Sequence, residues 1–162
     1  VTNEHALKAA LSTHASIVAK KVRVQHSLIK RLVVFATSSP HDDNYYKKSI
    51  TYEFPVATDN TLKIVAAVSY VFDNIYKAGI MFYRCGFGAV ELENSRFLQQ
   101  DMFNVSVDNQ LLMKCYDNVN NRYGSGTVEV AVAEKNEKWA MRRNFLSPSY
   151  TSKWTEIPKI KC

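Results

Sequence analysis

Two stretches of the chain repeat their hydrophobic residues at the spacing of an amphipathic helix. The first runs from Thr2 to about Gln25, and its apolar stripe consists of Leu7, Leu11, Val18 and Val22. The second covers residues 60–77, and its stripe consists of Leu62, Val65, Val68, Phe72 and Ile75. Asp59 or Asn60 can cap this second helix, and Gly79 can end it.

Three further segments carry strand patterns. The apolar run Leu32 to Ala36 predicts a buried strand, and the alternating residues Ser49 to Phe54 predict a half-buried antiparallel strand. A last strand is expected from about Phe82 to Leu92. The order helix, strand, strand, helix, strand is a split βαβ pattern that lacks most of its opening strand. We therefore expect an α+β fold with an antiparallel sheet covered by two helices.

The periodicity changes after Asn94. Residues 95–108 predict a linker, and Gln110 to Asn121 predict a short helix. A turn at residues 124–126 and a strand over Thr127 to Ala133 are expected to follow. The chain thus divides into a domain over residues 1–94, a linker over 95–108 and a small α+β C-terminal module over 109–162.

The net charge of +6 is concentrated at the two ends of the 162-residue chain. Residues 1–35 hold six Lys or Arg against one acidic residue, and residues 135–162 hold seven against two. Such asymmetry favours a polyanion such as nucleic acid, although solvated helix surfaces would give the same pattern. No membrane-spanning run or signal-peptide order is present, which predicts a cytoplasmic protein without a membrane partner.

Several of the basic residues lie on or beside the predicted strands. Candidate DNA-binding residues are Lys30 and Arg31 at the first strand, Lys47 and Lys48 before the second, and Arg84 in the third. If both helices cover one face of the sheet, these side chains can line the other face or its rim. There they would contact phosphates without reading bases. A solvated sheet face with scattered cations is the alternative.

Signatures of catalysis are absent. The cysteines Cys85, Cys115 and Cys162 lack the spacing of a disulfide framework or a zinc site. The acidic pair in residues 41–43, His-Asp-Asp, could hold a metal, but Asp is an ordinary turn former and a second set of ligands is missing. Residues 123–127 lack the context of a P-loop. We expect no catalytic residue, metal or cofactor in this chain. A small hydrolase built around Cys85 or His41 is a rival that full activity after changing both to Ala would dismiss.

The linker contains a short motif suited to docking in a partner's pocket: Gln99, Gln100, Asp101, Met102 and Phe103. Met102 and Phe103 are adjacent large apolar groups, and Gln99 can supply amide hydrogen bonds. The alternative is that both apolar side chains fold back onto the chain's own core.

The whole chain resembles the C-terminal part of UmuC-type Y-family DNA polymerases, the catalytic subunits of bacterial DNA polymerase V. The resemblance is carried by residues 75–79, by the strand Tyr83-Arg84-Cys85-Gly86 and most specifically by residues 139–151. It implies that residues 1–94 form the little finger that lies along the DNA, and that residues 99–103 bind the sliding clamp. The last part would be a UmuC-specific module, whose Arg142 and Arg143 are further basic candidates for DNA or a protein.

The resemblance also implies partners and a role. The partners are primer–template DNA, the sliding clamp, a UmuD-type accessory subunit and the recombinase filament. The family's palm domain, where Mg²⁺ is expected, has no counterpart in this chain. We therefore expect the DNA-binding and clamp-docking region of an error-prone translesion polymerase of the SOS response. The alternative is a stand-alone truncated protein that occupies the clamp or a UmuD-type partner without polymerase activity.

Overall fold

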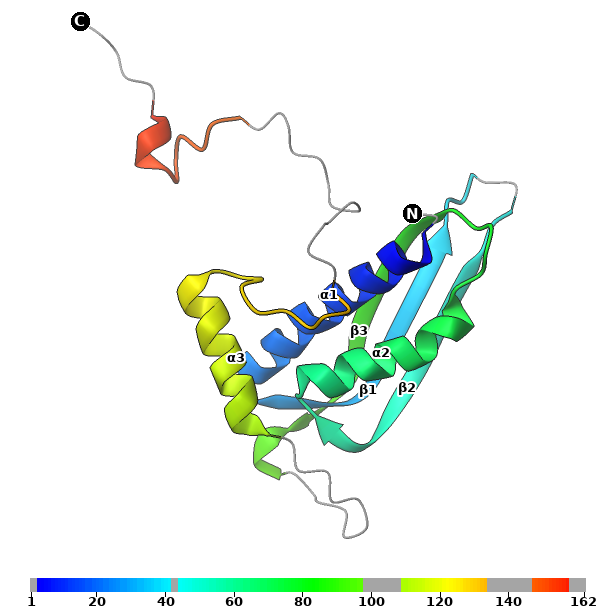
Figure 1. Cartoon of the computed structure of the whole chain (residues 1–162), viewed down its shortest axis with the longest axis horizontal. Coiled ribbons are helices and arrows are strands. Elements are labelled where there is room, and N and C mark those ends of the chain that lie inside the picture. The colour runs from blue at the N-terminus through cyan, green and yellow to red at the C-terminus, as the bar shows by residue number, and fades with distance from the viewer. Residues whose placement is uncertain (1–2, 42–43, 98–108, 134–146, 158–162) are drawn as a thin grey trace, which may run out of the picture.

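The structure, a computed structural model, describes residues 3–41, 44–97, 109–133 and 147–157. Its elements in chain order are α1 (Glu4–Val24), β1 (Ser27–Ser38), β2 (Lys47–Thr58), α2 (Thr61–Ile75), β3 (Phe82–Asn94), η1 (Ser95–Phe97), α3 (Gln110–Tyr123) and η2 (Trp154–Glu156). The expected α+β class and the helix–strand–strand–helix–strand order are confirmed (Figure 1).

Local sequence explains where the two long helices begin. The side chain of Asn3 accepts a hydrogen bond from the backbone N–H of His5 at 3.0 Å and so caps α1. Asn60 does the same for α2 by accepting from the N–H of Leu62 at 2.9 Å. Lys21 and Arg23 lie in the last turn of α1, where positive charge is favoured by the helix dipole.

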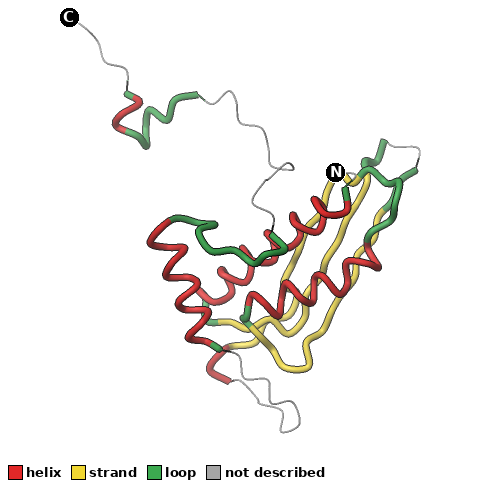
Figure 2. The backbone as a smooth tube through the Cα atoms, viewed as in Figure 1, coloured by secondary structure: helices red, strands yellow, loops and turns green. Residues whose placement is uncertain are grey.

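The three strands form an antiparallel sheet in the order β2-β1-β3. Both α1 and α2 lie on one side of this sheet (Figures 1 and 2). The alternation of β1 follows from this arrangement, since Leu32, Val34 and Ala36 are fully buried. They meet the apolar stripes of both helices, which include Leu11 and Phe72. The core of the described fold lies between the two helices and this face of the sheet.

The intervening residues of β1 point to the opposite, open face of the sheet. Arg31, Val33, Phe35 and Thr37 are only half-buried, in contrast to the buried neighbours between them. One face of the sheet therefore carries the core and the other presents side chains outward.

The C-terminal part of the chain is helical where the sequence predicted a helix, but the expected strand over Thr127 to Ala133 is wrong. These residues form turns, and a backbone hydrogen bond joins the N–H of Ala133 to the oxygen of Val130 at 2.8 Å. The side chain of Asn120 binds both the N–H and the oxygen of Val128, each at 3.0 Å. This side chain occupies the groups through which a neighbouring strand would pair.

Among the described residues, no helix is long and apolar enough to cross a membrane. The same residues contain no group of three or more His, Cys, Asp or Glu arranged to hold a metal ion.

Candidate nucleic-acid interface

The register of the two strand pairings identifies the residues that share the open face. Residues paired across an antiparallel ladder point to the same side of the sheet. From one end to the other, the four rungs in the order β2–β1–β3 are Lys47–Thr37–Arg84, Ser49–Phe35–Gly86, Thr51–Val33–Gly88 and Glu53–Arg31–Glu91.

The first rung places two of the predicted DNA-binding residues at one end of the face. Lys47 and Arg84 flank Thr37 from opposite sides, and both are exposed. The Arg84 guanidinium lies over the Tyr83 ring, with 5.5 Å between its carbon and the ring centroid. That contact supports the guanidinium at the surface without neutralising its charge.

The two middle rungs form a strip of low relief. A Cβ atom added at Gly86 would lie 2.5 Å from Cζ of Phe35, so the Phe35 ring occupies the space a side chain would need. At Gly88 the same atom would lie 3.2 Å from Cγ1 of Val33. A glycine in a strand interior is typical of a site where another chain approaches closely. The strip can therefore face the sugars of a nucleic-acid backbone.

The last rung sets a third predicted residue between two carboxylates. Nη2 of Arg31 lies 3.0 Å from Oε2 of Glu53 and 3.3 Å from Oε2 of Glu91. The two glutamates come from the strands on either side of β1. Arg31 is thus on the predicted face, but its charge has partners within the protein.

The other two predicted cations are placed differently. Nζ of Lys30 donates a hydrogen bond to the backbone oxygen of Pro55 at 2.9 Å. Lys48 is paired with Ala36, which is fully buried beneath the helices. Lys48 therefore points to the helix side of the sheet and is exposed at its rim. The structure brings Lys47 and Arg84 to one rung and separates Lys48 from them.

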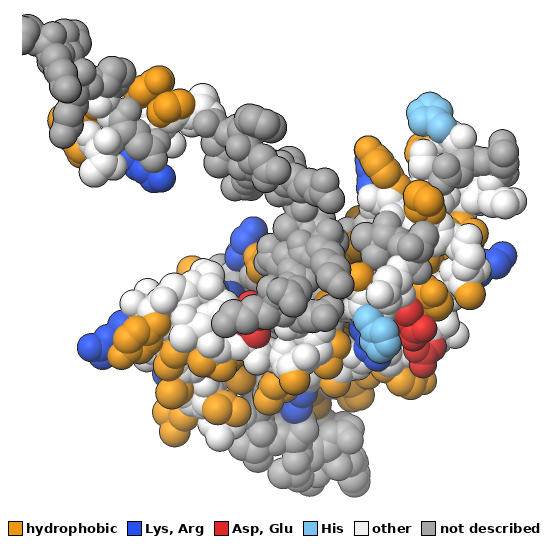
Figure 3. Space-filling model, turned by 45° about the horizontal axis from the view of Figure 1, so that its top comes forward, with side chains coloured by type: hydrophobic (Ala, Val, Ile, Leu, Met, Phe, Trp, Pro, Cys, Tyr) orange, Lys and Arg blue, Asp and Glu red, His pale blue; other side chains and the backbone are white. Residues whose placement is uncertain are grey.

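Two sets of predicted residues lie outside the described part of the chain. They are the peptide Gln99, Gln100, Asp101, Met102 and Phe103, and the basic pair Arg142 and Arg143. On the helix-bearing side seen in Figure 3, the Lys and Arg side chains of the described residues lie apart from one another, between hydrophobic patches.

An arginine that was not among the predicted site residues joins all three long helices. Arg23 of α1 makes a two-pronged ion pair with Asp117 of α3, with N–O distances of 2.7 and 2.8 Å. Its Nη1 also donates to the backbone oxygen of Asp59 and to Oγ1 of Thr61, at 2.7 and 2.8 Å. The Arg23 side chain is 9% exposed. No local sequence pattern predicts the ion pair, because Arg23 and Asp117 are 94 residues apart in the chain.

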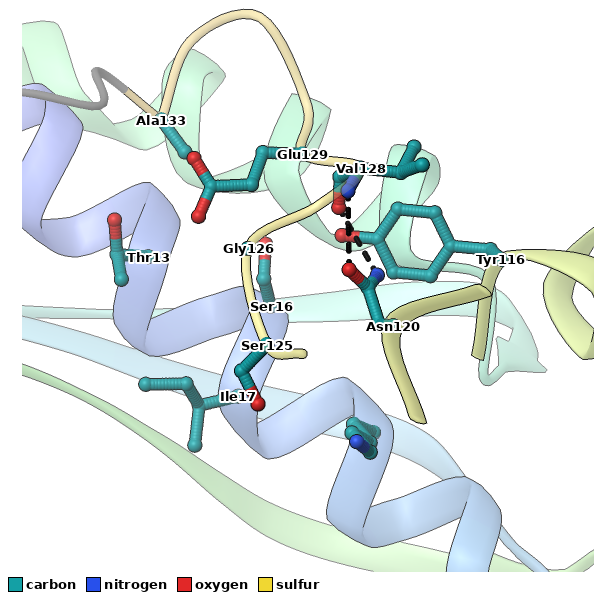
Figure 4. A pocket seen from close by; sticks show the side chains of 11 residues that line it. Thr13, Ser16, Ile17, Tyr116, Asn120, Ser125, Gly126, Val128, Glu129 and Ala133 are labelled. Carbon is teal, nitrogen blue, oxygen red and sulfur yellow. Dashed lines mark hydrogen bonds between the residues drawn. The ribbon is translucent and has the colours of Figure 1, made fainter. Parts of the chain in front are cut away.

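A cavity of about 220 Å³, below the 300–1,000 Å³ common for ligand pockets, lies where α1 faces α3 and the following loop (Figure 4). Thr13 and Ser16 line it from α1, and Tyr116 lines it from α3. Burial raises the pKa of the Tyr116 hydroxyl, and the Glu129 carboxylate adds to the rise. The cavity belongs to the contact between α1 and the C-terminal part, away from the open face.

Cys85, the residue of the hydrolase alternative, lies on the helix side of β3. It pairs with the buried Ala36 and is half-buried. Burial raises the pKa of its thiol above the ordinary value, so the thiolate needed for nucleophilic attack is disfavoured.

Comparisons with known proteins match the chain in two parts. Residues 1–102 match the impB/mucB/samB family C-terminal domain, and residues 110–160 match a domain of unknown function, DUF4113. Similar curated proteins are UmuC of Salmonella typhimurium at 25% identity, SamB of the same organism at 27% and MucB of Escherichia coli at 27%. The alignments cover 99%, 99% and 94% of this chain. The chain spans only 39%, 39% and 37% of those relatives' lengths.

Proposed function

Because the chain belongs to the impB/mucB/samB family and corresponds to the C-terminal part of its UmuC-type members, we propose that it grips DNA for a translesion polymerase. The proposed DNA-binding surface is the open face of the sheet. The observation that carries this proposal is the rung where Lys47 and Arg84 flank Thr37 beside the low-relief strip. Two exposed cations next to a flat surface suit the phosphates and sugars of a duplex.

The proposed contact is independent of base sequence. Lys and Arg that reach phosphates fix the position of a protein on a duplex but carry no sequence information directly. A polymerase that copies damaged templates needs such a grip, because a lesion changes the base and leaves the phosphate backbone in place. The affinity for DNA would then fall strongly as the salt concentration rises, because binding releases counterions from the phosphates.

We further propose that residues 99–103 dock on the sliding clamp. The adjacent Met102 and Phe103 supply two apolar anchors, and the peptide follows the DNA-gripping domain directly. Tethering to the clamp makes each return to the DNA nearly intramolecular, so a weak grip suffices. In a UmuC-type polymerase these two functions would serve DNA synthesis during the SOS response.

The test compares two neighbouring lysines on opposite faces of β2. Binding of fluorescent primer–template DNA is measured for the wild-type chain, for Lys47→Gln with Arg84→Gln, and for Lys47→Gln and Lys48→Gln singly. We expect the first variant to lower the slope of log K against log salt by about 0.9 for each lost phosphate contact. Lys48→Gln changes the same charge on the helix side and should have the smaller effect. Equal losses for Lys47→Gln and Lys48→Gln alone would overturn the assignment of the open face.

A further inference from the structure

Arg31 is the only basic residue among the twelve open-face positions of the four rungs that has two carboxylates within ion-pair distance. Glu53 and Glu91 hold it from the neighbouring strands, at 3.0 and 3.3 Å. The side chains are 41% exposed for Arg31, 54% for Glu53 and 48% for Glu91. All three therefore meet solvent and can be reached by a ligand on the open face.

This rung reverses the charge at one end of the face. One guanidinium and two carboxylates leave a net negative charge, whereas the Lys47–Thr37–Arg84 rung is positive. Arg31 and Thr37 are six residues apart on β1, roughly 20 Å at the rise of a strand. A screening length of about 8 Å at physiological ionic strength keeps the two ends electrostatically distinct. The charge of the open face therefore changes along the strands, from positive at the Lys47–Thr37–Arg84 rung to negative at the Glu53–Arg31–Glu91 rung.

We infer that Glu53 and Glu91 form a latch that keeps Arg31 from DNA phosphates and so limits the affinity of the open face. This inference rests on the proposed function. The guanidinium has a planar fork that suits a phosphate as well as it suits a carboxylate. A phosphate approaching this rung must displace at least one carboxylate and overcome the repulsion of both.

Exposure makes such an exchange of partners feasible. Surface ion pairs contribute little stability, because solvent and salt screen them. The latch therefore weakens binding at this end without abolishing it. Two glutamates around a single arginine are more than is needed to neutralise its charge, which argues against a role limited to compensation.

A purely structural role makes a different prediction. The β1 register shifts between Ile29 and Arg31 in both pairings, so the rung also borders a bulge. The ion pairs can hold the three strands together beside this bulge. If holding the strands together were the only role, removing the carboxylates would lower stability and leave DNA affinity unchanged or reduced. A latch requires that affinity rises.

The experiment measures DNA binding by the full chain, using fluorescent primer–template DNA over a range of salt concentrations. Glu53→Gln plus Glu91→Gln removes both carboxylate charges and keeps the side-chain shape. Glu4→Gln removes one carboxylate charge from an exposed residue of α1, so it is the control for Glu53→Gln and Glu91→Gln measured singly. We expect the double variant to bind roughly threefold to tenfold more tightly at low salt, with the salt slope steeper by about 0.9.

Repeating the double change in an Arg31→Gln chain separates a latch from simple repulsion. Once Arg31 is gone there is nothing to release, so the gain should shrink to about twofold or less, which is the scale of screened surface charges. An undiminished gain without Arg31 would overturn the latch. An unchanged or weaker affinity of the double variant in the presence of Arg31 would overturn it too. Urea unfolding of each variant shows that the protein compared is folded.

The same titrations tell failure of the latch from failure of the proposed function. Wild-type binding that depends on Lys47 and Arg84, with no gain in the glutamate variant, rejects only the latch. Absence of DNA binding by the wild-type chain and the glutamate variant alike rejects the open face as a DNA grip, and the latch falls with it.

Discussion

At the level of single residues, the packing of the open face requires that residue 86 is a glycine. The Phe35 ring fills the space above Gly86, and a Cβ there would approach Cζ of the ring to 2.5 Å. Gly86→Ala therefore forces the ring to swing outward. Alanine restricts the unfolded chain and so stabilises the folded state by about 0.4–1 kcal/mol. This gain does not offset the packing that the displaced Phe35 ring loses. We expect a net loss of about 1 kcal/mol in the free energy of unfolding, measured in urea.

Gly88→Ala is the matched control for this prediction, since its Cβ would lie 3.2 Å from Val33 and needs only a small shift. It should be less destabilising than Gly86→Ala. A Phe35→Ala background removes the clash and should remove the penalty at Gly86. An equal penalty with and without the ring would show that Phe35 is not the cause.

The cysteines give a second residue-level prediction. Burial raises the pKa of the Cys85 thiol, whereas Cys115 is exposed on α3. Only the thiolate reacts with disulfide reagents, so Cys85 should react more slowly than Cys115 at neutral pH. In a Cys162→Ser chain, labelling should show two phases, and Cys115→Ser should delete the fast one. Loss of the slow phase instead would contradict the burial of Cys85.

Residue positions on the sheet were predictable only in part. Alternation in β2 put Ser49, Thr51 and Glu53 on one face, as observed. The carboxylates around Arg31 were not predicted, because their positions depend on the register of β1 against both neighbours. A shift of one residue would turn every side chain to the other face. Lys47 and Lys48 are separated for a simpler reason, because successive side chains of a strand point to opposite faces.

At the level of elements, α3 is held to the domain by one nearly buried ion pair. Arg23 and Asp117 have side chains that are 9% and 18% exposed. Thr61 donates its backbone N–H to the sulfur of Met113, 3.4 Å away, beside the same arginine. The Lys20–Asn121 contact, at 2.6 Å, also joins α1 to α3 but is exposed. The two contacts join the same helices at different depths.

This difference in depth predicts how α3 is attached. Asp117→Asn leaves the nearly buried Arg23 charge poorly compensated and should weaken the docking of α3 by about 2 kcal/mol. Asn121→Ala removes only the exposed bond and should cost well under about 1 kcal/mol. Hydrogen exchange should accelerate roughly thirtyfold across α3 in the first variant while β1 remains protected. Uniform acceleration of both elements would mean that α3 does not open separately.

Helices were easier to predict than the C-terminal strand because helical signals are local. The caps Asn3 and Asn60 directly precede the helices they specify, and the apolar stripes lie within those helices. Residues 127–133 alternate like a strand, but a strand also needs a partner, and the Asn120 side chain binds the backbone of Val128 instead. That side chain's role depends on where α3 ends, which alternation does not encode.

At the level of the whole molecule, the two proposed functions belong to separate parts of the chain. The cationic rung lies on the sheet, and the peptide proposed to bind the clamp, residues 99–103, falls between η1 and α3 in sequence. Binding of DNA and binding of the clamp should therefore be separable by mutation. Coupling between them would arise from tethering, because one bound partner raises the local concentration of the other.

Separability predicts a crossed result when binding to the sliding clamp and to primer–template DNA is measured for two double variants. Met102→Ala with Phe103→Ala removes both apolar anchors and should lower clamp affinity more than about tenfold, since anchoring side chains commonly contribute about 2 kcal/mol or more. It should leave salt-sensitive DNA binding intact. Lys47→Gln with Arg84→Gln should do the reverse. Ser106→Ala, in the same linker, controls for changes near the peptide. A variant that impairs both activities while remaining folded would mean that DNA and clamp share one surface, and the two-site model would be wrong.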